Sequence, residues 1–171
     1  MTLRIRPATP RDAALLAELG ARTFRDAFGA QNDPADLAAF LATEFSPERQ
    51  AADLAQAEWT TLLAEVDGLA VGYAQSLPRE APVPLDPGPV RFLRRLYLEQ
   101  AWTGRGVGRP LLSAIAADAR DRGVATLWLN TWERATHAIA FYRKQGFAEV
   151  GTMTFMVGND AQRDLVFALR L

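Results

Sequence analysis

The sequence predicts a three-layer α/β fold, in which a mixed and largely antiparallel central sheet of about seven strands carries helices on both faces. Two observations predict it: a β-hairpin precedes a single strand-helix-strand unit, and two further strands follow that unit as an antiparallel ending. The chain has 171 residues, 49% of them hydrophobic, which suits one core of ordinary size. We therefore expect residues 1–171 to form a single domain.

Hydrophobic periodicity separates the expected strands from the expected helices. Runs with alternating or β-rich character predict strands at 3–7, 60–66, 69–77, 90–98, 125–130, 149–157 and 164–171. Apolar residues every three or four positions predict helices at 10–20, 34–41, 47–59, 109–122 and 136–145. The expected helix caps are polar residues at the start and glycines after the end: Thr9, Asp33, Ser46, Gly123 and Gly146.

Two local signals connect these elements. Asp67 and Gly68 separate two strand-like runs, and this dipeptide supplies the positive φ angles of a two-residue hairpin turn. Five of the ten prolines fall between residues 78 and 89. Because proline breaks helices and lacks the donor that a central strand needs, this stretch is predicted to be a surface loop.

Composition excludes several classes of function. Nineteen basic and twenty acidic residues give a net charge of -1, so the positive field that nucleic acid or an anionic membrane requires is missing. With no cysteine, the chain has neither a disulfide framework nor a sulfur nucleophile. No apolar run resembles a signal peptide or a membrane span, and no constellation suggests a metal. We expect a cytoplasmic protein without nucleic-acid, membrane or metal partners.

A glycine-rich segment between an expected strand and an expected helix carries the strongest chemical signal. Gly104, Gly106 and Gly108 allow backbone N–H groups to converge, and the following helix start adds partial positive charge. Arg105 and Arg109 would reinforce a phosphate or pyrophosphate site there. The alternative is a glycine-rich turn with no ligand. A P-loop is excluded because no Gly-Lys-Ser/Thr follows, and the Gly-x-Gly-x-Gly spacing fits a Rossmann fingerprint badly.

These residues resemble the GCN5-related N-acetyltransferase (GNAT) family, whose signature is Gln/Arg-x-x-Gly-x-Gly/Ala after the fourth strand. The segment 103–108 is similar to it, with Thr103 in place of Gln or Arg. About 30 residues downstream, the segment 127–151 resembles the second family motif, with Ala135 in place of the usual Asn. Similarity to PaiA-type spermidine/spermine acetyltransferases extends over nearly the whole chain.

The resemblance implies acetyl-CoA as co-substrate, bound where the fourth and fifth strands separate. It implies a pyrophosphate site on the glycine loop and a pantetheine arm beside the end of the fourth strand. The cofactor-binding residues implied are Leu96, Tyr97, Leu98, Thr103, Gly104, Arg105, Gly106, Val107, Gly108, Arg109, Asn130, His137, Ala138, Phe141 and Tyr142.

The resemblance also implies two catalytic groups. The backbone N–H of Leu98 would polarise the acetyl carbonyl, and Tyr142 would give a proton to the departing thiolate. The alternative for Tyr142 is an ordinary core aromatic. The strand-four glutamate that often serves as base in this family is missing, since Phe92 and Arg94 occupy the expected positions.

The base therefore stays open between Glu65, Glu99 and a path to solvent. His137 is the only histidine, and its place in the second motif makes it a helix-surface or CoA-contacting residue rather than a base. The three serines lack His-Asp partners, which disfavours a serine hydrolase.

Charge distribution suggests the kind of acceptor. Residues 26–65 hold eight acids and one arginine, whereas residues 88–117 hold five arginines and one glutamate. This asymmetry suits a cationic amine opposite a polyanionic cofactor, although solvated helix surfaces would give the same composition. We expect the acceptor pocket to be bordered by Phe24, Asp26, Phe28 and Trp132.

The predicted function is transfer of acetyl from acetyl-CoA to a primary amine of a small, polyamine-like acceptor by direct attack. The alternatives are acetylation of a protein, peptide or amino-acid amine, and a CoA-binding regulatory module that has lost catalysis. The substitutions at Thr103 and Ala135 favour the regulatory module, and the retained Tyr142 favours the enzyme. We expect a monomer or a homodimer.

Overall fold

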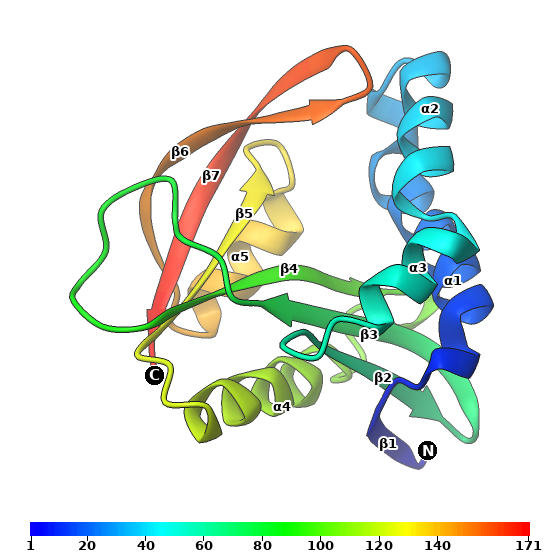
Figure 1. The fold of residues 1–171 in the computed structure, drawn as a ribbon. Coiled ribbons are helices and arrows are strands. Elements are labelled where there is room, and N and C mark those ends of the chain that lie inside the picture. Colours follow the sequence, from blue (N-terminus) through cyan, green and yellow to red (C-terminus); the bar gives the residue numbers. More distant parts are fainter.

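A computed structural model describes residues 1–171 and shows one seven-stranded sheet in the order β1-β2-β3-β4-β5-β7-β6 (Figure 1). The strands are β1 (Leu3–Pro7), β2 (Thr60–Val66), β3 (Leu69–Leu77), β4 (Val90–Leu98), β5 (Thr126–Trp132), β6 (Ala148–Val157) and β7 (Asp160–Arg170). The helices are α1 (Ala13–Phe28), α2 (Pro34–Glu44), α3 (Pro47–Leu54), α4 (Gly108–Asp121) and α5 (Thr136–Lys144). Short 3₁₀ turns lie at Pro10–Asp12, Gly29–Gln31 and Gln100–Trp102.

The three-layer arrangement predicted from the sequence is confirmed. Neighbouring strands are antiparallel except β4 and β5, which are parallel and joined through α4. Helices α4 and α5 cover one face, where Leu111, Ile115 and Ile139 join the largest hydrophobic cluster. Helices α1, α2 and α3 cover the other face, and the β6–β7 hairpin reaches the far end of α2 (Figure 1). No helix combines the length and the apolarity that a membrane span needs.

The hairpin of β2 and β3 forms where the dipeptide signal placed it. Asp67 and Gly68 have φ angles of 50° and 86°, the left-handed conformation that a tight two-residue turn needs. The expected caps also form: the side chain of Asp33 accepts hydrogen bonds at the start of α2, and that of Ser46 at the start of α3. Gly123 and Gly146 follow their helices with positive φ.

Several predicted boundaries are wrong, and three of them differ from the structure by four residues or more. Helix α1 continues to Phe28 instead of ending at Gly20, because Gly20 serves close packing: a Cβ there would lie 2.4 Å from the ring of Phe45. Helix α3 ends at Leu54 rather than at residue 59. Strand β7 begins at Asp160 rather than at residue 164, since the β6–β7 turn lies earlier than its composition suggested.

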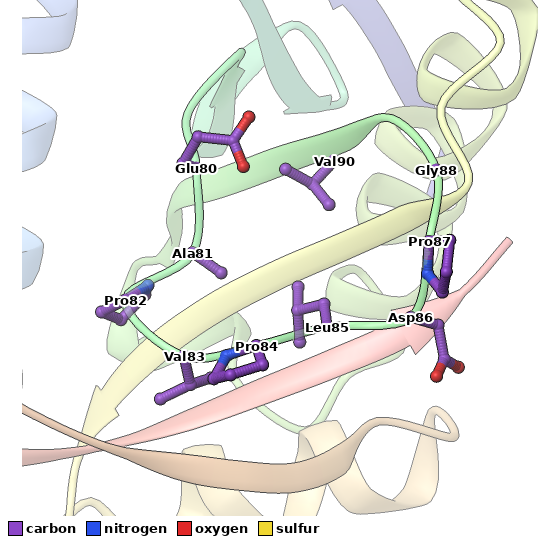
Figure 2. Close-up of a pocket in the computed structure, with 10 residues that line it drawn as sticks. All are labelled: Glu80, Ala81, Pro82, Val83, Pro84, Leu85, Asp86, Pro87, Gly88 and Val90. Atoms are coloured by element: carbon purple, nitrogen blue, oxygen red, sulfur yellow. The ribbon is translucent and has the colours of Figure 1, made fainter.

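The proline-rich segment 78–89 is a loop that runs past β5 and β6, and Figure 2 shows the hollow beside it, of about 460 Å³. Val83 packs against Gly151 of β6, where a Cβ would lie 2.7 Å from its methyl group. The charged residues that line this hollow are Glu80 and Asp86. Because an acidic wall repels phosphates, this loop is not a place for an anionic cofactor.

Candidate active site

The sheet opens between β4 and β5. The two strands pair only over Val90–Phe92 and Thr126–Trp128, although β4 continues to Leu98. Backbone N–H groups alternate in direction along a strand, and that of Glu99 donates to Val71 of β3 at 2.9 Å. The N–H of Leu98 therefore points away from β3, toward the gap between β4 and β5. An extended ligand can pair with β4 from this side.

The glycine loop follows β4 directly and leads into α4. Gly104 and Gly106 have φ angles of 77° and 84°, and a Cβ on either would meet no atom within 4 Å. The N–H groups in the first turn of α4 have no partner within the helix. Thr103, Arg105 and Arg109 are exposed beside them, and neither arginine forms an ion pair within the chain. The loop thus offers open backbone donors and two free cations to an anion.

Three segments predicted to contact the cofactor meet at one point. A Cβ on Gly108 would lie 3.4 Å from Leu98 at the end of β4 and 3.4 Å from the ring of Phe141 in α5. Val107 is fully buried beneath them, and Ala138 packs against the same cluster. An open β4 edge, a donor-rich helix start and an unfilled space over the glycines together fit the pantetheine and pyrophosphate of a CoA molecule.

The phenol of Tyr142 is buried on α5 and has no hydrogen-bond partner within the chain. Its ring contacts Phe141 and Phe147, with centroids 5.3 and 5.6 Å away. Burial raises the pKa of Tyr142 above its ordinary value, and the phenol of Tyr97 adds to the shift. The hydroxyl therefore keeps its proton at neutral pH and is available as a hydrogen-bond donor to an anion such as a departing thiolate.

The remaining residues proposed for the cofactor lie in different settings. Leu96 packs against the main core, whereas His137 is exposed on α5. Asn130 on β5 donates a hydrogen bond from Nδ2 to Oδ2 of Asp164 at 2.6 Å. Asn130 therefore interacts with β7, and one of the two N–H donors of its amide is used there.

An aromatic wall stands on the other face of the sheet, beside the opening. Phe24 and Phe28 of α1 lie one helical turn apart with ring centroids 4.7 Å apart. Phe28 meets Trp132 of β5 at 6.1 Å, and Phe24 meets Tyr97 of β4 at 6.4 Å. The structure thus brings together three of the four residues predicted for the acceptor pocket and adds Tyr97.

Asp26 does not join this wall. It is exposed, and two residues of helix place it about 200° around α1 from Phe24, on the side away from the rings. The predicted charge asymmetry also takes another form. Arg94 on β4 binds Asp53 and Glu44 at 2.8 Å each, and Arg95 binds Glu44 at 3.0 Å. Carboxylates and arginines from the two oppositely charged segments thus neutralise each other inside the protein.

The open question of the base also changes with the structure. Glu65 lies on β2, two strands from β4, and its carboxylate pairs with Arg6 at 2.7 Å. Glu99, just beyond β4, pairs with Arg22. Phe92 stacks on Trp128, with centroids 4.2 Å apart. Both carboxylates pair with arginines, which take up part of their hydrogen-bonding capacity.

Sequence reasoning missed a third carboxylate near the opening. Asp164 lies on β7 opposite Trp132, is 3% exposed, and has no arginine or lysine partner. The signal that could have found it is a single acid on the inward face of a strand that continues as Leu-Val-Phe-Ala. No group of His, Cys, Asp or Glu in the structure could hold a metal ion.

The site has the features of an acyl-transfer enzyme: a gap between the parallel strands β4 and β5, a glycine loop at a helix start, and the buried phenol of Tyr142. Comparison with known proteins places the chain more closely: the acetyltransferase (GNAT) family matches residues 24–147. An N-acetyltransferase of Mycobacterium tuberculosis is 33% identical over 160 residues, covering 94% of this chain and 98% of that protein. The aminoglycoside N(6')-acetyltransferase type 1 of Stenotrophomonas maltophilia is 35% identical over 153 residues, covering 88% and 90%.

Among solved structures, the PaiA N-acetyltransferase from Thermoplasma acidophilum in complex with coenzyme A superposes with a TM-score of 0.83 over 100% of both chains, at 18% identity. The chain belongs to the GNAT family. It is an N-acetyltransferase that uses acetyl-CoA as its co-substrate. The membership of the GNAT family that the two sequence motifs predict is confirmed.

Proposed function

We propose that the chain acetylates a primary amine of a small cationic acceptor, of the polyamine type, by direct attack on acetyl-CoA. The observation that carries the proposal is the aromatic wall of Phe24, Phe28, Tyr97 and Trp132 beside the opened sheet. Aromatic faces attract cations, and the guanidinium of Arg134 already lies 5.7 Å from the centroid of Trp132. An amine that enters from this face reaches the opening from the side opposite to the glycine loop.

The residues divide the chemistry between the two faces of the sheet. Acetyl-CoA supplies a thioester, an acyl donor whose carbonyl carbon an amine attacks directly. The N–H of Leu98 is positioned to donate to the oxygen on which negative charge grows. The phenol of Tyr142 supplies the proton that the departing sulfur takes up. The chain has no cysteine, so the acetyl group cannot be carried as a thioester on a cysteine of the protein.

Two observations support a small cationic amine as the acceptor: the aromatic wall and the names of two related enzymes. The Stenotrophomonas relative is named for aminoglycosides, and the Thermoplasma structure is a PaiA enzyme. Interior pairing with Arg94 and Arg95 takes Glu44 and Asp53 out of acceptor recognition. The proposed recognition therefore depends on aromatic faces rather than on these two carboxylates, and a slender cationic chain can lie along such faces.

A panel of acceptors tests the proposal. The purified protein is given acetyl-CoA with spermidine, an aminoglycoside, an amino acid and a peptide with a free N-terminus, and the release of free thiol is followed. We expect the largest kcat/KM for the polyamine. Faster turnover of the peptide or the amino acid would replace the polyamine as acceptor. Tight binding of acetyl-CoA without turnover of any amine would favour the regulatory module.

A further inference from the structure

Asp164 stands out among the carboxyl groups of the interior. Three carboxylates are buried, and two of them hold arginines: Asp12 pairs with Arg6, and Asp53 with Arg94. Asp164 accepts one hydrogen bond, from Asn130 to Oδ2, and its Oδ1 is buried without any partner. A buried hydrogen-bond acceptor without a donor reduces stability, so the unpaired Oδ1 of Asp164 indicates a functional role.

The position of Asp164 links it to the acceptor side of the opening. On β5 and β7 the side chains alternate between the two faces, and Asp164 is the register partner of Trp132. Val166, the next residue on the same face, packs with Trp128 and Phe92, opposite to the α4 side of the sheet. Asp164 therefore shares the face of the aromatic wall, beyond the point where β4 leaves β5.

Electrostatic coupling connects this carboxylate to the proposed acid. Burial raises the pKa of Tyr97, and the carboxylate of Asp164 adds to the shift. Tyr97 in turn contributes to the raised pKa of Tyr142. The three groups come from three elements that border the opening: Asp164 from β7, Tyr97 from β4 and Tyr142 from α5.

We propose that Asp164 accepts the proton of the acceptor ammonium, an inference that rests on the proposed acetyl transfer. An N–H bond of the ammonium breaks and leaves its electron pair on nitrogen, while an O–H bond forms at Oδ1 of Asp164. The neutral amine is then the nucleophile. The second proton passes from nitrogen to water as the amide forms, and water returns a proton to the phenolate that Tyr142 becomes when it protonates the sulfur. The proton on Asp164 returns to water after the product leaves.

The surroundings tune this carboxyl group for the task. Burial raises the pKa of Asp164 to about 6, the hydrogen bond from Asn130 opposes the shift, and the charge of Glu133 adds to it. The other charged groups near this end of the strands are Arg163, which pairs with Glu133 at 3.2 Å, and Arg134, over Trp132. A carboxyl group with this pKa is ionised at neutral pH and is a stronger base than an exposed aspartate.

Asp164→Asn tests the role with little change of shape. We expect kcat/KM for the acceptor to fall by about 10²-fold or more, with loss of the acid limb of its pH profile. Binding of acetyl-CoA, measured by calorimetry, should not change. Asp86→Asn is the matched control, since it makes the same substitution at an exposed carboxylate outside the site and should leave turnover within about twofold. Turnover of Asp164→Asn at the wild-type rate would overturn the inference.

A second variant keeps Asp164 in place. Asn130→Ala removes the hydrogen bond that lowers the pKa of Asp164, so the acid limb of the profile should move to higher pH. An unmoved limb in a folded Asn130→Ala protein would show that another group sets it. This variant also decides the matter if Asp164→Asn does not fold. Absence of acetyl transfer by the wild-type protein to every amine would instead refute the proposed function.

Stability against pH gives a readout that needs no substrate. The pKa of Asp164 is raised in the folded state, so its ionisation costs stability as the pH rises from about 4 to beyond 6. Asp164→Asn removes this cost. The Tm of the variant relative to the wild type should therefore increase over that range. A constant difference in Tm at every pH would indicate a purely structural partner for Asn130.

Discussion

Asp53 and Asp164 are both buried, one beside β4 and the other on β7, and they differ in what surrounds them. Asp53 lies on α3 within reach of Arg49, Arg94 and Arg95, with its closest contact at 2.8 Å. Asp164 lies on β7 with one amide donor and an unpartnered oxygen. A buried carboxylate whose oxygens are paired with arginines links elements of the fold. A buried carboxylate with an unpaired oxygen can instead accept a proton or a hydrogen bond from a ligand.

The same contrast separates two phenols. Tyr73 on β3 and Tyr142 on α5 are both buried, and neither hydroxyl has a hydrogen-bond partner in the chain. Tyr73 lies under α1, where its ring packs against Tyr97 at 5.7 Å. Tyr142 lies beside Phe141, which borders the glycine loop. An unfilled hydroxyl therefore indicates chemistry only where a ligand can reach it.

The largest expected effect lies in the ion-paired region. Asp53→Ala leaves Arg94 and Arg95 with one carboxylate in place of two, and it should reduce the free energy of unfolding by about 3 to 5 kcal/mol. Urea denaturation measures the change. Glu133→Ala, which breaks an exposed pair, should cost less than about 1 kcal/mol. Equal losses for the two variants would contradict the structural role of the buried pairs.

The second prediction compares the two phenols. Tyr142→Phe keeps the ring and removes the proton donor, so kcat should fall by about 10²-fold while acetyl-CoA affinity and stability stay nearly unchanged. Tyr73→Phe removes an equally buried hydroxyl and serves as the control, with turnover within about twofold of wild type. Free-thiol release under saturating substrates measures both. If Tyr142→Phe turns over normally, Tyr142 is a core aromatic and another group protonates the sulfur.

Much of the fold can be predicted from local sequence signals. Contacts in the core between residues that are distant in sequence cannot be predicted in this way. The Asp67-Gly68 turn and the proline starts of α2 and α3 act within a few residues, so the sequence shows them. Gly20 signals a helix end locally, yet it lies inside α1 because Phe45, from a distant helix end, needs the space. Contacts of this kind depend on the tertiary structure.

The candidate site divides in the same way. The glycine loop and Tyr142 belong to motifs that are contiguous in sequence, and the structure places them at one junction with Leu98. Composition alone gave the acidic segment a role in acceptor binding, because the ion pairs of Asp53 with β4 are not visible in sequence. The sequence did not indicate Asp164 either, because what distinguishes this residue is that its buried Oδ1 has no hydrogen-bond partner, and a missing contact is visible only in the structure.

The third prediction compares two glycines with the same backbone conformation. Gly106 and Gly68 have φ angles of 84° and 86°, and a Cβ on either meets nothing within 4 Å. Gly106→Val should raise the Kd of acetyl-CoA at least tenfold, about 1.4 kcal/mol, by blocking approach to the loop amides. Gly68→Val carries the same backbone strain in the hairpin and should leave the Kd unchanged. Calorimetry that finds equal Kd values for both variants would remove the phosphate site from the glycine loop.

The smallest expected effect concerns Asp26, on the outer side of α1. At about 10 Å in water, one charge attracts a cation by about 0.4 kcal/mol, so Asp26→Asn should raise the KM of a polyamine about twofold at low salt. The Debye length falls from about 10 Å at 0.1 M salt to about 3 Å at 1 M, and the difference between the variant and the wild type should then vanish. The KM of a monovalent amine of similar length should move less, because only one of its charges is attracted.

Two results would change this account of the acceptor side. A tenfold rise in KM on Asp26→Asn that persists in 1 M salt would mean direct contact, which requires α1 to turn or to unwind near Phe28 when the acceptor binds. Equal salt sensitivity for the polyamine and the monovalent amine would show that the second charge of the acceptor is not recognised. In that case the aromatic wall selects for shape, the polyamine assignment fails, and acetyl transfer remains.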